Sequence, residues 1–274
     1  MTGIPPVRPS ETTDFIRCPR LWHWKHVERW EAPISTWTPE RLIGAALHAG
    51  IAAYWRGQPP GGGVLLAFGT DWPPDAPPEF SQDALESHTL KVLDKVLAWI
   101  AKELPDVRPV MVEEPLGPNG HTTPDLVTRE QADILTVTDW KYHHILDADR
   151  VRYRLEGIER THQFLHYCWA VGERLGEPVR QFRKVAIVGG PRILIREATF
   201  QPTLSMLEQW LTGARQMWED MAEMRAGRRV AYQREAGCFM YGPKWPCPMY
   251  EGCWTCHGNR EKMAQFYTRN VDAA

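Results

Sequence analysis

Apolar side chains recur at helical spacing along several stretches of the chain, most clearly from 81 to 104, where they share one face. This pattern is typical of an amphipathic helix packed on a core. A break is expected at Cys18-Pro19, because proline cannot continue a helix from within, and Thr38 and Gly176 have the residue types that start and end helices. The remaining helices are predicted over 10–27, 38–57, 154–175 and 202–227.

Shorter runs rich in apolar and β-branched residues have the character of strands. They cover 109–115, 122–128, 133–142, 180–188 and 192–200. Polar residues 129–132 separate the second run from the third, and Gly189-Gly190-Pro191 separates the last two, so each pair is expected to form a hairpin. The order of helices, three strands, helix, two strands and helix predicts an α/β fold with a central mixed β-sheet flanked by helices.

The Pro and Gly residues between 58 and 80 change the picture of the first half of the chain. This stretch holds Pro59-Pro60-Gly61-Gly62-Gly63 and two further Pro-Pro pairs, so we expect a long loop without regular structure. The predicted organisation is therefore N-terminal helices over 1–57, this loop over 58–80, a core over 81–229 and a cysteine-rich segment over 230–274.

Composition narrows the class of protein. The chain has 274 residues, of which 43% are hydrophobic and 24% charged, as in an ordinary globular protein. A net charge of -2 argues against bulk polyanion binding, so contact with nucleic acid would need a local basic groove. No signal-like segment and no run of about 18 apolar residues is present. We expect a cytoplasmic protein without a membrane partner or anchor.

Basic residues in the second half of the chain are candidates for such a groove. Acidic residues lie among them, as they do on an ordinary solvated surface. The candidates are Arg150, Arg152, Arg154, Arg160, Arg180, Arg183 and Lys184.

Chemistry enters with the first predicted hairpin. If it turns near Ala132, residues equally far from that position along the chain face each other, as Asp125 and Asp139 would. Their Cβ atoms would then lie about 5 Å apart. Alternation keeps Asp139 and Lys141 on one face and sends Trp140 to the other. Two carboxylates so close favour a shared proton or a divalent cation. Mg²⁺ or Mn²⁺ would activate water toward a phosphoryl group, while the lysine offsets developing charge.

Other readings of these residues stay open at this point. A surface hairpin with one ordinary Asp-Lys ion pair and no active site could have the same sequence motif. Glu113 or Glu114 could complete the site as a third acid, or could simply end a strand in solvent. His48 adjoins an apolar helical stripe, where a histidine is more often a hydrogen-bonded core residue than a metal ligand.

The C-terminal segment contains Cys238, Cys247, Cys253 and Cys256 among Gly, Pro, Tyr and Trp. Such a segment lacks the periodicity to fold by packing alone and needs a staple. Disulfides are disfavoured without a secretion signal. Zinc held by Cys247, Cys253, Cys256 and His257 is one candidate, and an iron-sulfur cluster is another. Residues 253–257 also match the attachment pattern of c-type haem, which normally accompanies export.

Taken together in order, these motifs resemble the iron-sulfur branch of the PD-(D/E)XK nuclease superfamily. That branch includes the AddB nuclease domain, the CRISPR-adaptation nucleases and RecB-like phage exonucleases. The resemblance extends from about Ser10 to Cys256. The motifs are Cys18-Pro19, Gly44 to His48, Pro124-Asp125, Asp139-Trp140-Lys141, Gln163 with Tyr167, and the C-terminal cysteines.

The resemblance implies a restriction-endonuclease-like core and a helical subdomain, built from both ends of the chain, that a [4Fe-4S] cluster staples. It assigns Lys141 as the catalytic lysine, and Gln163 with Tyr167 as the pair that orients the active site and the scissile strand. The implied Mg²⁺ or Mn²⁺ ligands are His48, Asp125, Asp139 and the backbone carbonyl of Trp140. The implied cluster ligands are Cys18, Cys238, Cys247 and Cys253.

Two departures from the family pattern are visible. The family commonly has a glycine shortly before the first acid, whereas Gly120 lies five residues before Asp125. Cys256 is an additional cysteine, so the fourth cluster ligand stays open. The zinc site that includes Cys256 is also still an alternative.

The implied function is metal-dependent hydrolysis of DNA phosphodiester bonds, by an exonuclease acting on single strands or on DNA ends. The alternative is a non-catalytic iron-sulfur or zinc module that binds DNA within a recombination or CRISPR-related complex. No G-x4-G-K-[ST] motif occurs, so unwinding would come from a helicase, recombination or CRISPR-adaptation partner. The sequence does not decide cleavage polarity, endonuclease or exonuclease mode, DNA or RNA preference, or oligomeric state.

Overall fold

The structure is a computed structural model of the chain, and it divides into two compact units that are described separately. The sheet unit is formed by Thr36–Leu207, and the cysteine unit by Pro5–Ser35 with Glu208–Ala274. None of the described helices is both long and apolar enough to span a membrane. The described residues are 7–31, 38–74, 76–116, 122–130, 133–144, 151–152, 155–156, 161–232, 247–249, 252–253, 256 and 259–269.

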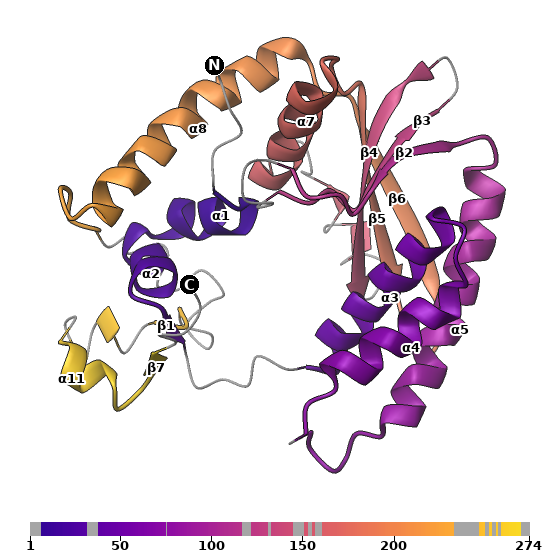
Figure 1. Cartoon of the computed structure of the whole chain (residues 1–274), viewed down its shortest axis with the longest axis horizontal. Helices are drawn as coiled ribbons and strands as arrows, with labels where there is room; N and C mark the ends of the chain where they lie inside the picture. The colour runs from indigo at the N-terminus through magenta and orange to yellow at the C-terminus, as the bar shows by residue number, and fades with distance from the viewer. Residues whose placement is uncertain are drawn as a thin grey trace. The chain divides into compact units, whose positions relative to one another are not determined.

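A five-stranded mixed sheet forms the centre of the sheet unit (Figure 1), as the order of elements predicts. The neighbours β4 and β5 run parallel, and the other neighbouring pairs run antiparallel. In spatial order the strands are β2 (Arg108–Val112), β3 (Leu126–Arg129), β4 (Leu135–His143), β5 (Gln181–Val188) and β6 (Leu194–Phe200).

Both predicted hairpins are present. In the first, Leu126 pairs with Thr138 and Val127 with Val137, which is the register expected for a turn centred near position 132. Residues 131 and 132 themselves lie outside the described residues. In the second, β5 and β6 pair antiparallel along their whole length. The register of the first hairpin places Asp125, just before β3, level with Asp139 of β4.

Helices cover the two faces of this sheet (Figure 1). The helices α3 (Pro39–Trp55), α4 (Pro60–Asp71) and α5 (Gln82–Glu103) share one apolar core with Trp140 and Val185 of the sheet. On the other face lies α7 (His162–Leu175), where the ring of Phe164 lies 4.7 Å from that of Phe182. Alternation along β4 therefore sends Trp140 toward the core and Asp139 toward α7.

The predicted helix ends at Thr38, Ser81 and Gly176 are confirmed, whereas the helix predicted over 154–175 begins only at His162. The Thr38 hydroxyl accepts a hydrogen bond from the Arg41 amide at 3.2 Å, and the Ser81 hydroxyl accepts one from the Ala84 amide at 3.3 Å. At the end of α7, Gly176 has a φ of 71°, a left-handed conformation that glycine adopts readily.

The expectation of a loop over 58–80 is wrong for 60–71, which form α4. The glycines there serve close packing. A Cβ on Gly63 would lie 2.6 Å from the Ala49 carbonyl oxygen of α3, so only glycine lets the two helices approach this closely. Val64 and Phe68 then become fully buried. The contact with α3 outweighs the low helix propensity of glycine, which a local pattern cannot show.

The cysteine unit joins both ends of the chain. The predicted joint at Cys18-Pro19 is confirmed, because α1 ends at Arg17 and α2 begins at Pro19. The strand β1 (Trp30–Glu31) pairs with β7 (Thr268–Arg269), a contact that the sequence did not suggest. The described helices and turns of this unit are α1 (Pro9–Arg17), α2 (Pro19–Trp22), a π-helical turn (His23–Val27), α8 (Leu204–Arg225), whose first turn belongs to the sheet unit, and α11 (Arg260–Met263).

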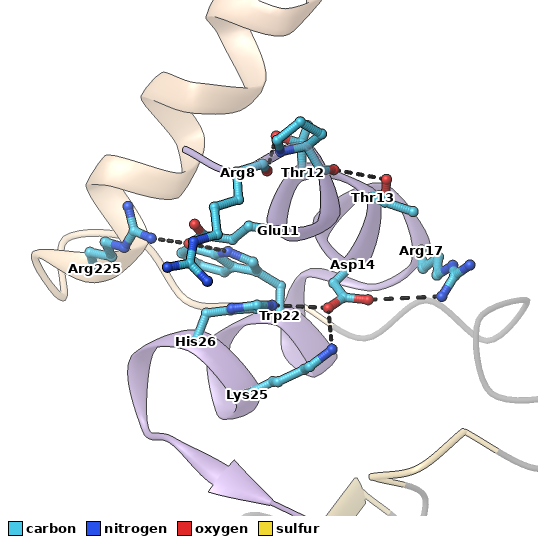
Figure 2. A network of polar contacts seen from close by, with 11 residues as sticks. Arg8, Glu11, Thr12, Thr13, Asp14, Arg17, Trp22, Lys25, His26 and Arg225 are labelled. Atoms are coloured by element: carbon cyan, nitrogen blue, oxygen red, sulfur yellow. Dashed lines mark hydrogen bonds and ion pairs between the residues drawn. The ribbon is translucent and has the colours of Figure 1, made fainter. Parts of the chain in front are cut away.

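Polar contacts hold the N-terminal helices of the cysteine unit together (Figure 2). The Asp14 carboxylate binds the Lys25 ammonium at 2.8 Å and the His26 ring at 2.9 Å. Glu11 accepts a hydrogen bond from the Trp22 indole at 3.1 Å and pairs with Arg225 of α8. Burial alone would raise the pKa of Asp14, but the hydrogen bonds from His26 and Lys25 lower it below its ordinary value. Asp14 therefore remains a carboxylate that fixes the helices on both sides of Cys18.

The close approach of α4 to α3 gives a test by substitution. Gly63→Ala is expected to lower the free energy of unfolding by about 1–3 kcal/mol, because the new methyl group meets backbone atoms that cannot move aside cheaply. Gly62→Ala is the control, since a Cβ there meets nothing within 4 Å, and it should stabilise by up to about 1 kcal/mol. Urea unfolding measures both, and equal stability of the two variants would contradict the packing role of Gly63.

Candidate active site

The first predicted site residues come together at the paired ends of β3 and β4. One carboxylate oxygen of Asp125 accepts a hydrogen bond from the Trp140 amide at 2.7 Å. The Lys141 ammonium lies 2.8 Å from an oxygen of Asp139. The Asp139 side chain is only 4% exposed, and that of Asp125 is 13% exposed. Two buried carboxylates and one ammonium thus meet at one point, as the hairpin register predicts.

His48 of α3 adjoins these acids. Its Nε2 atom lies 2.9 Å from the Trp140 carbonyl oxygen. A carbonyl only accepts, so Nε2 carries the hydrogen of this bond. The other ring nitrogen, Nδ1, lies 3.6 Å from Asp125 and 3.9 Å from Glu113. His48 therefore belongs to the site, and the Trp140 carbonyl is engaged by His48 in this arrangement.

The structure distinguishes between the two candidate third acids. Glu113 directly follows β2, its amide donates to the Asp125 carbonyl at 3.1 Å, and its carboxylate faces His48. Glu114 is exposed. The φ of Glu113 is 47°, a left-handed conformation that costs free energy for a residue with a Cβ and is found mainly at functional sites. The sequence pattern could not choose between the two, because this local twist breaks the alternation of the strand.

Helix α7 supplies the predicted polar pair. Gln163 and Tyr167 lie one helical turn apart, and the Gln163 amide reaches the Tyr167 hydroxyl at 3.1 Å and Asp139 at 3.4 Å. Burial raises the pKa of Tyr167 to about 12, and the charges of Asp139 and Asp125 act in the same direction. Tyr167 is therefore a neutral hydroxyl at physiological pH, able to donate a hydrogen bond into the site.

The positive charges near Asp125 are too few to stabilise its ionised carboxylate fully. Its burial, with the nearby charge of Asp139, raises its pKa to about 6, against the opposing effects of His48, Lys141 and the Trp140 amide. Burial alone would lower the pKa of Lys141, but the charges of Asp139 and Asp125 outweigh it and raise that pKa above its ordinary value. Lys141 stays charged, and one ammonium does not balance two buried acids.

The residues of the site fit a divalent cation by donor type and by charge. Carboxylate oxygens and an imidazole are ligands that Mg²⁺ or Mn²⁺ accepts, and a cation would relieve the excess negative charge. As they stand, no three His, Cys, Asp or Glu side chains among the described residues are gathered as one ion requires. The Trp140 amide and the Lys141 ammonium occupy carboxylate oxygens instead.

Comparison with known protein families shows to which family the chain belongs. Residues 7–253 match the PD-(D/E)XK nuclease superfamily. The chain belongs to the PD-(D/E)XK nuclease superfamily. Its Pro124-Asp125 and Asp139-Trp140-Lys141 segments supply the letters of the superfamily's name, and members typically use divalent metals. No protein of curated function matches the sequence.

One solved structure shares the fold of this chain. A protein from Eubacterium rectale, provisionally named an exonuclease, is 14% identical and matches with a TM-score of 0.50 over 93% of this chain and 88% of that chain. This likeness concerns the fold alone. SSO0001 is also 14% identical over 78% of this chain and 85% of its own, but its TM-score of 0.27 is too low to support an argument.

Four of the six cysteines of this PD-(D/E)XK chain lie together in the cysteine unit. Cys18, Cys247, Cys253 and Cys256 are buried in one apolar cluster with Trp24, Trp30, Met249 and Met263. These described cysteines form no disulfide, and no described group of them has the spacing of a metal-ion site. Cys238 and His257 lie outside the described residues. Cys168 is also buried, on α7, where burial raises the pKa of its thiol.

The basic residues proposed for a nucleic-acid groove differ in exposure and in their ion pairs. Arg183 is 5% exposed and binds Glu130 at 2.9 Å and Glu197 at 3.0 Å, so its assignment to a phosphate groove is wrong. Arg152 pairs with Glu156 at 2.6 Å. Arg150, Arg154 and Arg160 lie outside the described residues.

Two histidines of α7, the half-buried His162 and the buried His166, predict that acid lowers the stability of the fold. Burial lowers the pKa of His162 to about 4 and that of His166 to about 3, below the ordinary value of about 6.5. The unfolded chain therefore binds protons first, and the stability that these neutral rings provide is fully present above about pH 6.5. It falls as the pH drops toward the folded pKa values, by up to about 1.4 kcal/mol per pH unit for each histidine.

The measurement is urea unfolding between pH 7.5 and pH 4 for the wild type and for His166→Gln. The variant should show a shallower loss of stability with acid, because glutamine does not titrate. The same slope in both proteins would contradict the assignment of acid sensitivity to His166.

Proposed function

We propose that this chain is a divalent-metal-dependent DNA nuclease, and that it acts as an exonuclease on single-stranded DNA or on DNA ends. The observation that carries the proposal is the pair of buried carboxylates, Asp125 and Asp139, with the charged Lys141 beside them, in a chain of the PD-(D/E)XK superfamily. The exonuclease mode is supported by the resemblance to iron-sulfur exonucleases and by the fold shared with the Eubacterium rectale protein.

The proposed cation ligands are Asp125, Asp139, His48 and the carbonyl of Trp140. When bound, Mg²⁺ or Mn²⁺ would supply Lewis-acid activation of the phosphoryl group and of the attacking water. The His48 bond to the Trp140 carbonyl ties α3 to β4. It holds the imidazole against Asp125 before substrate arrives.

Lys141 and α7 supply the remaining chemistry. The Lys141 ammonium lies 2.8 Å from Asp139, where it can donate a hydrogen bond to the developing negative charge. Gln163 holds Asp139 in place, and the neutral Tyr167 hydroxyl beside it donates toward the substrate strand. Water enters as the nucleophile, and one oxygen of the cleaved bond leaves with a proton from solvent.

We further propose a structural [4Fe-4S] cluster in the cysteine unit, with Cys18, Cys238, Cys247 and Cys253 as the ligands that the resemblance assigns. Support comes from the burial of Cys18 with C-terminal cysteines in one apolar cluster. Thiolates are the ligands of such clusters, and the cluster would join chain segments more than 200 residues apart. Cys256, buried with the same group, is the alternative fourth ligand. A helicase, recombination or CRISPR-adaptation protein is the proposed partner.

Lys141→Ala tests the nuclease. Hydrolysis should fall by at least about 100-fold, the usual loss when one donor to developing charge is removed. The measurement uses anaerobically purified protein with 5'- and 3'-end-labelled single- and double-stranded DNA in Mg²⁺ or Mn²⁺, and chelator should abolish cleavage. The label lost first gives the polarity. Lys102→Ala is the matched control, because Lys102 is exposed on α5 and pairs with Glu103, and it should cleave like the wild type.

No cleavage by folded wild-type protein on any of these substrates, or full activity of Lys141→Ala, would contradict the nuclease proposal. Tight DNA binding without cleavage would support the binding-module alternative instead.

The cluster has its own test. Cys18→Ser should lose bound iron and acid-labile sulfide and should unfold more easily. Cys168→Ser, in the other unit, should keep the iron and the sulfide. Metal and sulfide analysis of the anaerobically purified proteins measures this. Stoichiometric zinc without sulfide in the wild type would refute the cluster and favour zinc. Comparing Cys238→Ser with Cys256→Ser identifies the fourth ligand.

A further inference from the structure

The site residues form one row across the sheet. Glu113 and Asp125 are joined by a backbone hydrogen bond at the end of the β2–β3 pair, and Asp125 stands level with Asp139 through the register of β3 and β4. On β5, the direct partner of Asp139 is Lys184. On β6, the partner of Lys184 is Ala198. The row therefore runs from three acids to a lysine along the strand order β2, β3, β4, β5.

Lys184 lies on the same face of the sheet as the site. Its neighbours two residues away on β5 are Phe182, which packs against Phe164 of α7, and Ala186, which belongs to a cluster with Val151 and Leu155. The intervening Val185 belongs to the core under α3 and α5. Alternation thus directs Lys184 toward α7, the side to which Asp139 and Gln163 also belong.

The charge of Lys184 adds to that of Lys141. Asp139 already binds Lys141 at 2.8 Å and Gln163 at 3.4 Å. Lys184 lies one strand spacing beyond Asp139, about 4.8 Å, on the side away from Asp125. On the next strand, the exposed Arg196 pairs with Ala186 and shares this face. The row therefore has carboxylates at its β2 to β4 end and basic side chains on β5 and β6.

We propose that Lys184 is a phosphate-binding residue of this site. Its ammonium binds a substrate phosphate next to the one that is attacked at Asp125 and Asp139. The proposal rests on the proposed nuclease function and adds the direction of the strand across the sheet, from β3 toward β6. Arg183, the adjacent residue in sequence, is excluded from this role because it points to the opposite face and is held there by Glu130 and Glu197.

The test measures binding separately from cleavage. Fluorescence anisotropy of a labelled single-stranded oligonucleotide, with Ca²⁺ in place of Mg²⁺ to prevent hydrolysis, gives the Kd over a series of salt concentrations. Lys184→Met keeps the aliphatic stem and removes the charge. It should raise the Kd about tenfold, the value of one charged hydrogen bond, and reduce the magnitude of the salt slope by about 0.7. Lys184→Arg should restore both values.

A matched control is available on the far side of the sheet. Lys95→Met removes an equal charge from an exposed position of α5, and its Kd and salt slope should match the wild type. In steady-state cleavage, Lys184→Met should raise KM by a larger factor than it lowers kcat. If Lys184→Met does not fold, as judged by circular dichroism, Lys184→Gln replaces it.

The other possible results of these measurements contradict either the role of Lys184 alone or the nuclease function as well. A Kd and salt slope of Lys184→Met equal to those of Lys95→Met overturn the role of Lys184, while cleavage by the wild type leaves the nuclease proposal standing. A loss confined to kcat, with unchanged Kd, also overturns phosphate binding by Lys184. Wild-type protein that neither binds nor cleaves DNA would overturn both proposals.

Discussion

The antiparallel pairing of β3 with β4 is the constraint on which the site depends. It sets Asp125 level with Asp139 and leaves two acids in a poorly hydrated place with one ammonium beside them. Such an arrangement costs free energy that a well-packed neutral pair would not. The surrounding contacts offset part of this cost, through the Trp140 amide on Asp125 and the Gln163 amide on Asp139. The negative charge that remains on the two acids would attract a cation, and the ammonium would attract a phosphodiester.

Each layer of the sheet unit contributes to this pairing in a different way. The core under α3, α4 and α5 buries Trp140 and so fixes which residues of β4 face α7. α3 also brings His48 to the Trp140 carbonyl. A glycine contact lets α4 pack against α3, so a stretch far from the chemistry supports the helix that carries a site residue. α7 holds Asp139 from the opposite side of the sheet.

The cysteine unit is formed from segments near both ends of the chain, which are held together by local contacts. Besides the pairing of β1 with β7, two sets of side-chain contacts connect these segments. One is the polar contact set of Asp14 and Glu11, which connects the N-terminal helices to each other and to α8. The other is the apolar cluster that buries Cys18 with cysteines from the C-terminal segment. A metal group at those thiols would add a further and stronger connection.

The sequence by itself determined the hairpin register, the cap of α3 and the proximity of Asp125, Asp139 and Lys141, because alternation, turns and caps are local. Only the tertiary structure decided the rest. It made a helix of the glycine-rich stretch and placed the Glu113 carboxylate beside His48. These outcomes depend on contacts between residues far apart in the chain. Such contacts leave no periodic trace in the sequence, since they arise only when distant segments pack against each other.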